Sequence, residues 1–141
     1  MNKQTRRTFI KAAALSAAAA ATSKAAMAQN QFTLSGVPHP YPDEWLPDGV
    51  RSRFVDNVNG LRVHVLEAGF ETSNRPALLL LHGFPELAYS WRNVMKPLAD
   101  AGYHVIVPDL RGYGRTTGWN SDYDADLTPF RMLNKVRDAL G

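Results

Sequence analysis

The 141-residue sequence contains no cysteine, and this absence excludes several kinds of chemistry. The chain forms no disulfide, offers no thiolate nucleophile and has no cysteine to receive a lipid anchor. An oxidising compartment is therefore harmless to it. Long apolar runs are also lacking near the start, where the apolar stretch of residues 12–22 is too short to cross a bilayer core of about 30 Å. We therefore predict no permanent membrane anchor.

An excess of basic residues is lacking once the first 28 residues are set aside. The whole chain has 16 lysines and arginines against 13 acidic residues. Five of the basic residues and none of the acidic ones lie in residues 1–28, so the remaining 113 residues hold 11 basic and 13 acidic side chains. The positive net charge therefore gives no support for nucleic-acid binding, which needs a basic face on the folded part.

Residues 1–28 have the composition of an export signal. A basic start is followed by an alanine-rich stretch and by Ala26 and Ala28, the small residues of a cleavage site. The start "TRRTFIK" resembles a twin-arginine signal with Arg6 and Arg7 as the pair, and a merely basic signal for the general export route is the alternative. We expect the export machinery to be a partner and the chain to be periplasmic or secreted.

Residues 29–50 are predicted to form an extended arm lying over the domain. They are rich in proline, which fixes φ and removes backbone donors. The four prolines are Pro38, Pro40, Pro42 and Pro47. Tyr41 and Trp45 are expected to hold the arm by packing.

A β-hairpin is predicted next, around Asn59-Gly60, a pair that favours the positive φ angles of a tight turn. After the turn, apolar residues alternate with polar ones, which predicts a half-buried strand. His64 falls on the polar side of this pattern and is expected to be a solvated surface residue.

Two buried strands with a helix between them follow. Leu78 to Leu81 are apolar without alternation, as in a strand covered on both faces, and residues 105–107 resemble them. Between them, residues 91–99 have the apolar period of a helix. Its expected N-cap is Ser90, Pro97 should kink or split it, and Gly102 should end it.

A second helix is predicted from Thr128 as N-cap, with Pro129 at its first position. Its apolar stripe comprises Phe130, Leu133, Val136 and Leu140. The whole order predicts an α/β fold in which a hairpin and parallel strands are flanked by helices.

The turn His82-Gly83-Phe84-Pro85 follows the first buried strand, where ligand sites gather at the carboxyl ends of parallel strands. Glycine lets the backbone turn sharply, and the proline makes a cis bond possible. Such a turn can aim a backbone N–H into a crevice, as an oxyanion site requires. A tight strand-to-helix turn without chemistry explains the residues equally well.

A second motif, Pro108-Asp109-Leu110-Arg111-Gly112-Tyr113-Gly114, follows the other buried strand. Together, the two motifs and their spacing resemble the amino-terminal part of the α/β-hydrolase superfamily, in the branch that contains epoxide hydrolases and haloalkane or haloacetate dehalogenases. The resemblance covers about residues 50–141. The Phe-Pro-Glu form of the turn is more similar to epoxide hydrolases.

The resemblance implies roles for the turn residues. The backbone N–H of Phe84 would hold the oxyanion formed when an ester intermediate is hydrolysed. His82 would brace the turn, formed with Gly83 and Pro85, and would not be the catalytic base.

The loop residues receive supporting roles from the same resemblance. Asp109 and Arg111 would belong to the loop scaffold, with Asp109 not the nucleophile. Gly112 and Gly114 would allow the turns of the loop, and Tyr113 is a candidate for lining the pocket.

The nucleophile elbow of the family, Gly-x-Ser-x-Gly or its aspartate version, does not occur in the sequence. We therefore expect residues 51–141 to be a partial hydrolase domain, truncated before the elbow, with none of the triad present and no activity of its own. The leucine-rich edge of residues 78–81 would then be bare and prone to aggregation.

No metal or organic cofactor is implied, and a small-molecule substrate is expected for the complete enzyme. The segment "GYGRTTG" lacks the third glycine of a dinucleotide loop, because Thr117 stands there. Alternatives to an epoxide hydrolase are a dehalogenase, a serine esterase or a haloperoxidase-like relative, and fold alone does not separate them. A non-catalytic fragment or small binding module is the alternative from another class.

Overall fold

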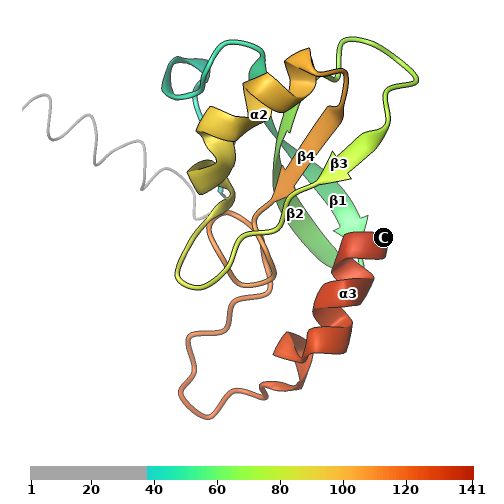
Figure 1. The fold of residues 1–141 in the computed structure, drawn as a ribbon. Coiled ribbons are helices and arrows are strands. Elements are labelled where there is room, and N and C mark those ends of the chain that lie inside the picture. Colours follow the sequence, from blue (N-terminus) through green and yellow to red (C-terminus); the bar gives the residue numbers. More distant parts are fainter. Residues whose placement is uncertain (1–37) are drawn as a thin grey trace, which may run out of the picture. The chain divides into compact units, whose positions relative to one another are not determined.

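The computed structural model of the chain describes residues 38–141. The predicted export signal, including Arg6, Arg7, Ala26 and Ala28, and the first part of the arm lie outside the described residues. Residues 38–141 form a four-stranded mixed sheet in the order β1-β2-β4-β3 (Figure 1). β1 and β2 are antiparallel, β2 and β4 are antiparallel, and β3 and β4 are parallel. The predicted α/β class is confirmed.

The hairpin joins β1 (Val50–Val58) to β2 (Leu61–Ala68). Asn59 and Gly60 have φ angles of 46° and 77°, so both central residues adopt the positive values that a tight two-residue turn needs. The register pairs Val58 with Leu61 and is interrupted between Val55 and Val58 by a bulge. The predicted hairpin is therefore confirmed, although its first strand begins earlier than expected.

β2 is not half-buried, as its alternating pattern predicted. It lies between β1 and β4, and all its residues except Arg62 are buried. His64 is 0% exposed and Glu67 is 1% exposed, so the expectation that His64 is a solvated surface residue was wrong. The polar residues of this strand are satisfied by other protein groups rather than by water.

β3 (Ala77–Leu79) and β4 (His104–Pro108) are the two strands predicted from apolar runs. β4 is buried at Val105 and Val107, as expected. β3 is short and lies at the edge of the sheet, with Leu79 42% exposed and, just beyond it, Leu81 45% exposed. The prediction of cover on both faces was wrong for the described residues, because the side chains of Ala77 and Leu79 are exposed. The expected bare edge is present there, since β3 pairs with β4 alone.

The helix between β3 and β4 consists of η2 (Ala88–Trp91) and α2 (Arg92–Asp100). Ser90 is not the N-cap, because its hydroxyl donates to the Leu87 carbonyl within η2 at 2.7 Å. α2 continues through Pro97 without being split. Gly102, with a φ of 98°, follows the end of the helix as predicted.

The carboxy-terminal segment forms η3 (Thr128–Phe130) and α3 (Met132–Leu140). Thr128 does not cap α3, whose N-cap is Arg131, and its own N–H donates to Asp126 at 2.8 Å. The predicted apolar stripe is present but uncovered among the described residues, since Leu133 is 77% and Leu140 is 83% exposed.

Two clusters of buried side chains lie on opposite faces of the sheet. One includes Leu66, Met95 and Val105 and joins α2 to the sheet, and the other includes Leu61 and Val63 beside the hairpin. The short η1 (Asp43–Trp45) lies in the arm. Across residues 38–141, no helix combines the length and apolar character required to span a bilayer.

Candidate active site

The turn after β3 contains the motif predicted to stabilise an oxyanion. The Phe84–Pro85 peptide bond is cis, and the Glu86 N–H donates to the Gly83 carbonyl at 3.0 Å. Gly83 is not in the left-handed region, and a Cβ there would meet nothing within 4 Å. Neither its φ angle nor the space around it therefore requires a glycine at this position. Phe84 itself is 84% exposed.

The loop after β4 contains the second motif and folds tightly on itself. Two backbone bonds, from Tyr113 to Leu110 at 2.8 Å and from Thr116 to Tyr113 at 3.0 Å, make consecutive turns. Gly112 and Gly114 have φ angles of 74° and 52°, values that favour glycine. A Cβ on Gly114 would collide with the Asp109 carboxylate.

A pair of reciprocal hydrogen bonds joins the turn to the loop. Nε2 of His82 accepts from the Leu110 N–H at 3.0 Å, and Oδ1 of Asp109 accepts from the Ala88 N–H at 2.9 Å. Each motif thus contributes one side chain that binds the main chain of the other. We call these two bonds the reciprocal clasp.

The hydrogen bonds of His82 define its tautomer. Because Nε2 accepts, the ring proton lies on Nδ1, which donates to the Gly83 carbonyl at 2.9 Å. The side chain is also only 6% exposed. Both ring nitrogens of His82 are thus engaged by the main chain, one by the turn and one by the loop.

Asp109 is the most heavily hydrogen-bonded side chain of the site. Besides Ala88, its carboxylate accepts from the Arg115 N–H at 3.0 Å and lies 2.8 Å from Nδ1 of His64. Burial alone would raise the pKa of Asp109, but the hydrogen bonds from His64, Arg115 and Ala88 outweigh it, so the pKa lies below its ordinary value. The Asp109 carboxylate is therefore engaged by groups of β2, of η2 and of its own loop.

His64 belongs to this site, although its sequence pattern predicted a solvated surface residue. Its ring lies between Asp109 and Ser52, with Nε2 2.7 Å from the Ser52 hydroxyl. The Thr116 hydroxyl accepts from the His64 N–H at 3.0 Å and donates to the Asp109 carbonyl at 2.6 Å. The position of His64 on a strand with a neighbour on each side is the feature that could have indicated this site, because a polar side chain buried there must bond to other protein groups.

The two other predicted loop residues lie at the edges of the site. The ring of Tyr113 packs edge-on against His82, with ring centres 5.1 Å apart. The Arg111 guanidinium makes a two-pronged ion pair with Asp138 of α3, at 2.9 and 2.6 Å, which is also bound by Asn59. Arg111 thus attaches α3 to the loop after β4, Asn59 attaches it to the hairpin, and Arg111 does not bind Asp109.

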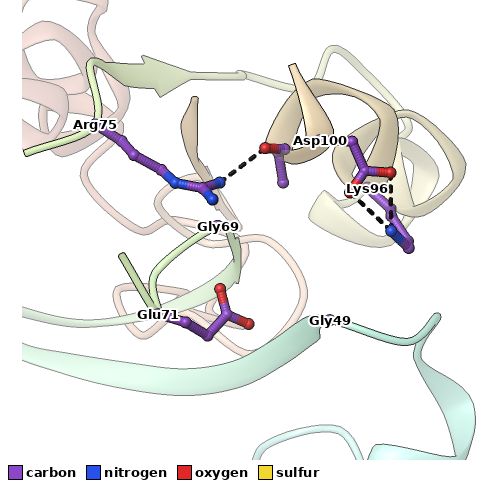
Figure 2. Close-up of a pocket in the computed structure, with 7 residues that line it drawn as sticks. Gly49, Gly69, Glu71, Arg75, Lys96 and Asp100 are labelled. Carbon is purple, nitrogen blue, oxygen red and sulfur yellow. Dashed lines mark hydrogen bonds and ion pairs between the residues drawn. The ribbon is translucent and has the colours of Figure 1, made fainter. Parts of the chain in front are cut away.

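A cavity of about 340 Å³ lies elsewhere, at the end of the sheet where β3 and β4 begin (Figure 2). It is lined by charged and small residues of the α2 end and of the segment after β2. These are Gly49, Gly69, Glu71, Arg75, Lys96, Ala99 and Asp100. Arg75 donates to the Ala99 carbonyl at 2.7 Å and Lys96 pairs with Asp100 at 2.8 Å, so these charges stabilise the end of α2. It contains no residue of the two motifs.

Within residues 38–141, no three histidine or acidic residues are grouped so that they could hold a metal ion.

Comparison with known proteins agrees with this geometry. Residues 76–141 match the family model described as the alpha/beta hydrolase fold. The crystal structure of Epoxide Hydrolase A from Mycobacterium thermoresistibile superposes with a TM-score of 0.56 and 40% identity, over 65% of this chain and 26% of that one. Potato (Solanum tuberosum) epoxide hydrolase I gives 0.54 and 43%, over 64% and 26%. The described residues therefore have part of the α/β-hydrolase fold.

Two curated relatives show which members of the superfamily the chain is similar to. It is 58% identical over 94 residues to an AB hydrolase superfamily protein of Bacillus subtilis, which covers 67% of this chain and 30% of the relative. It is 60% identical over 62 residues to Epoxide hydrolase A of Mycobacterium tuberculosis, which covers 44% and 18%. The chain belongs to the α/β-hydrolase superfamily and has epoxide hydrolases among its homologues. It spans less than a third of the length of these relatives.

Proposed function

We propose that this chain supplies the oxyanion turn and its supporting loop to an epoxide-hydrolase-like enzyme. The observation that carries the proposal is the reciprocal clasp, which fixes the turn at Phe84 from both sides through His82 and Asp109. Among the described residues, the Phe84 N–H donates no hydrogen bond, and so it can serve a substrate oxygen. The names of the solved relatives favour epoxides over the other substrates of the superfamily.

In the proposed reaction an aspartate outside residues 1–141 attacks an epoxide carbon, the C–O bond of the ring breaks, and an ester forms. Water then attacks the ester carbonyl and a tetrahedral oxyanion develops. The Phe84 N–H donates to this oxygen, a contribution of about 3 kcal/mol to the barrier for a typical oxyanion donor. Collapse of the intermediate releases a diol and restores the aspartate. The 141-residue chain alone, without an elbow nucleophile, is expected to be inactive.

A chimera tests the proposal. Residues 76–141 replace the matching segment of Epoxide hydrolase A of M. tuberculosis, and hydrolysis of an epoxide such as styrene oxide is measured. We expect turnover within about tenfold of the parent enzyme, since the contribution sought is backbone geometry. A chimera that folds and binds substrate but does not turn over would contradict the proposal.

A matched pair of substitutions in the active chimera isolates the amide. Phe84→Pro removes the backbone N–H, and Phe84→Ala removes the ring but keeps the N–H. We expect Phe84→Pro to slow ester hydrolysis by about 100-fold or more and Phe84→Ala to slow it much less. Equal effects would show that the ring, not the amide, matters.

Export is proposed as the second part of this function. The support is the Arg6-Arg7 pair and the small residues Ala26 and Ala28 of the sequence. Replacing both arginines by lysine should leave the protein in the cytoplasm, whereas the unchanged chain should be recovered outside it with Gln29 as its first residue. Continued export of the double variant would favour the general route.

A further inference from the structure

Ser52, His64 and Asp109 form a hydrogen-bonded array that has the order of a nucleophilic triad. The Ser52 hydroxyl is 2.7 Å from Nε2 of His64, and Nδ1 of His64 is 2.8 Å from the Asp109 carboxylate. These distances are within the range found between a serine nucleophile, its base and the orienting acid. The array joins three parts of the chain that are far apart in sequence: β1, β2 and the end of β4.

The surroundings of the array argue against nucleophilic chemistry. The Ser52 oxygen already accepts from the Tyr41 N–H at 2.8 Å. The His64 ring is 0% exposed and packs between the rings of Tyr41 and Phe54, with centres 5.3 and 5.4 Å away. The Ser52 oxygen is thus engaged by the arm, and the Tyr41 ring is itself covered by the Arg115 guanidinium at 3.5 Å.

The hydrogen-bond donors of the array can all be aligned toward Asp109. A carboxylate only accepts, so Nδ1 of His64 carries a proton toward Asp109. In the neutral tautomer of His64 that carries its proton on Nδ1, Nε2 has a free lone pair, and the Ser52 O–H donates to it. Hydrogen bonds aligned in this way polarise one another, and each strengthens the next.

The array ends on the carboxylate that holds the oxyanion turn. Asp109 accepts from the N–H of Ala88, the first residue of η2 after the turn, and from the N–H of Arg115 in the loop. His64 is thus one of three groups that bond to the Asp109 carboxylate, and Ser52 bonds to the other nitrogen of the His64 ring. Because Ser52 also accepts from Tyr41 of the arm, hydrogen bonds run without a break from the arm to Ala88, four residues after Phe84.

We propose that Ser52, His64 and Asp109 form a positioning relay that couples the docked arm at Tyr41 to the turn that presents the Phe84 amide. Ser52 and His64 are positioning residues that act through Asp109. The benefit of the relay for catalysis at the Phe84 amide rests on the proposed function. The coupling between the hydrogen bonds does not, and it can be measured without any epoxide.

Amide hydrogen exchange of the full 141-residue chain, followed by NMR, tests the relay. In Ser52→Ala we expect the Ala88 and Arg115 amides to exchange roughly 2- to 10-fold faster, the range that one hydrogen bond supports, and the Phe84 amide resonance to move. The Leu110 amide, held by His82 instead, is the internal reference and should change least.

Two control variants separate the relay from general destabilisation. Ser52→Thr keeps the hydroxyl and should restore slow exchange at Ala88, while Ser73→Ala, at an exposed position, should change none of these amides. Uniform acceleration that includes Leu110, or an unchanged Ala88 amide in Ser52→Ala, would overturn the relay.

Covalent labelling tests the nucleophilic alternative directly. The full chain is treated with a fluorophosphonate probe and its peptides are analysed by mass spectrometry. We expect no adduct on Ser52. An adduct there that disappears in His64→Gln would overturn the positioning role and establish Ser52 as a nucleophile.

Discussion

His82 and Asp109 each bind the main chain next to the other: His82 accepts from Leu110, the residue after Asp109, and Asp109 accepts from Ala88, six residues after His82. Both are buried and both have their hydrogen-bonding groups filled by protein. The turn and the loop are therefore joined by two separate hydrogen bonds, one accepted by each side chain.

Asp109→Asn should lower the free energy of unfolding by about 3 kcal/mol. The amide presents one oxygen where the carboxylate offers two, so the Ala88 or Arg115 N–H loses its acceptor. Urea denaturation followed by circular dichroism measures the loss. Asp100→Asn, in an exposed pair with Lys96, is the control and should cost less than about 0.5 kcal/mol. Equal losses would contradict the role of the clasp.

Stability should fall in acid because of Asp109 and Glu67. Burial would raise the pKa of Glu67, but hydrogen bonds from Arg53 and Arg51 outweigh it, and the pKa of Asp109 is lowered likewise. A lowered folded-state pKa gives stability that is complete above the ordinary values, 4.5 for Glu67 and 3.8 for Asp109, and that is lost as pH falls through the folded-state values.

Urea midpoints measured from about pH 6 down to about pH 3 test this dependence. Glu67→Gln should give a flatter profile than the unchanged chain, since it removes one of the two titrating carboxyls. A profile parallel to that of the unchanged chain would exclude Glu67 as a source of acid sensitivity.

Gly114→Ala should destabilise the chain by about 2 kcal/mol or more, since a side chain there must adopt a positive φ and collides with the Asp109 carboxylate. Gly83→Ala is the matched control in the other motif. It should change stability little, because a Cβ there meets nothing within 4 Å. Thermal melts of both variants measure the two losses of stability. A larger loss for Gly83→Ala than for Gly114→Ala would contradict the prediction.

A double-mutant cycle on Arg111 and Asp138 should give a coupling energy of about 1–3 kcal/mol. Their side chains are 10% and 11% exposed, and the pairing is two-pronged. The exposed Lys96–Asp100 pair, measured in the same way, should give only about 0.3–0.5 kcal/mol. Similar values for both pairs would mean that Arg111 does not hold α3 in solution.

Leu79→Lys should reduce aggregation of the chain. Leu79 is 42% exposed on the open edge strand, and a lysine there opposes edge-to-edge pairing. Light scattering at increasing protein concentration measures the effect. Tyr123→Lys adds the same charge at a fully exposed position away from the sheet and should help less. Equal improvement would assign the effect to net charge.

Local signals in the sequence predicted much of the fold. Asn59-Gly60 indicated the hairpin because the φ angles of a tight turn depend on those two residues alone. Residues 105–107 indicated a buried strand, and β4 is one. The predicted N-caps Ser90 and Thr128 were wrong, because a hydroxyl group has several possible partners nearby. The sequence does not show which of these partners it bonds to.

Errors in burial had a different origin. The polar alternation of β2 predicted a solvated face, but His64 and Glu67 bond to residues of other elements. His64 and Asp109 are 45 residues apart, and no local pattern links them. Leu79 is exposed for the opposite reason: cover for an apolar strand comes from other segments, which its own residues do not specify.

His82 and Asp109 bind backbone N–H groups of residues 110 and 115. These hydrogen bonds therefore do not depend on which side chains stand at those two positions. A substitution at Leu110 can therefore change the side chain at this position while its amide keeps the same acceptor. Arg115 differs, because its side chain packs over Tyr41 and donates to the His39 carbonyl, so a substitution there would also loosen the arm. Sequence variation next to the two motifs is therefore expected to be freer at residue 110 than at residue 115.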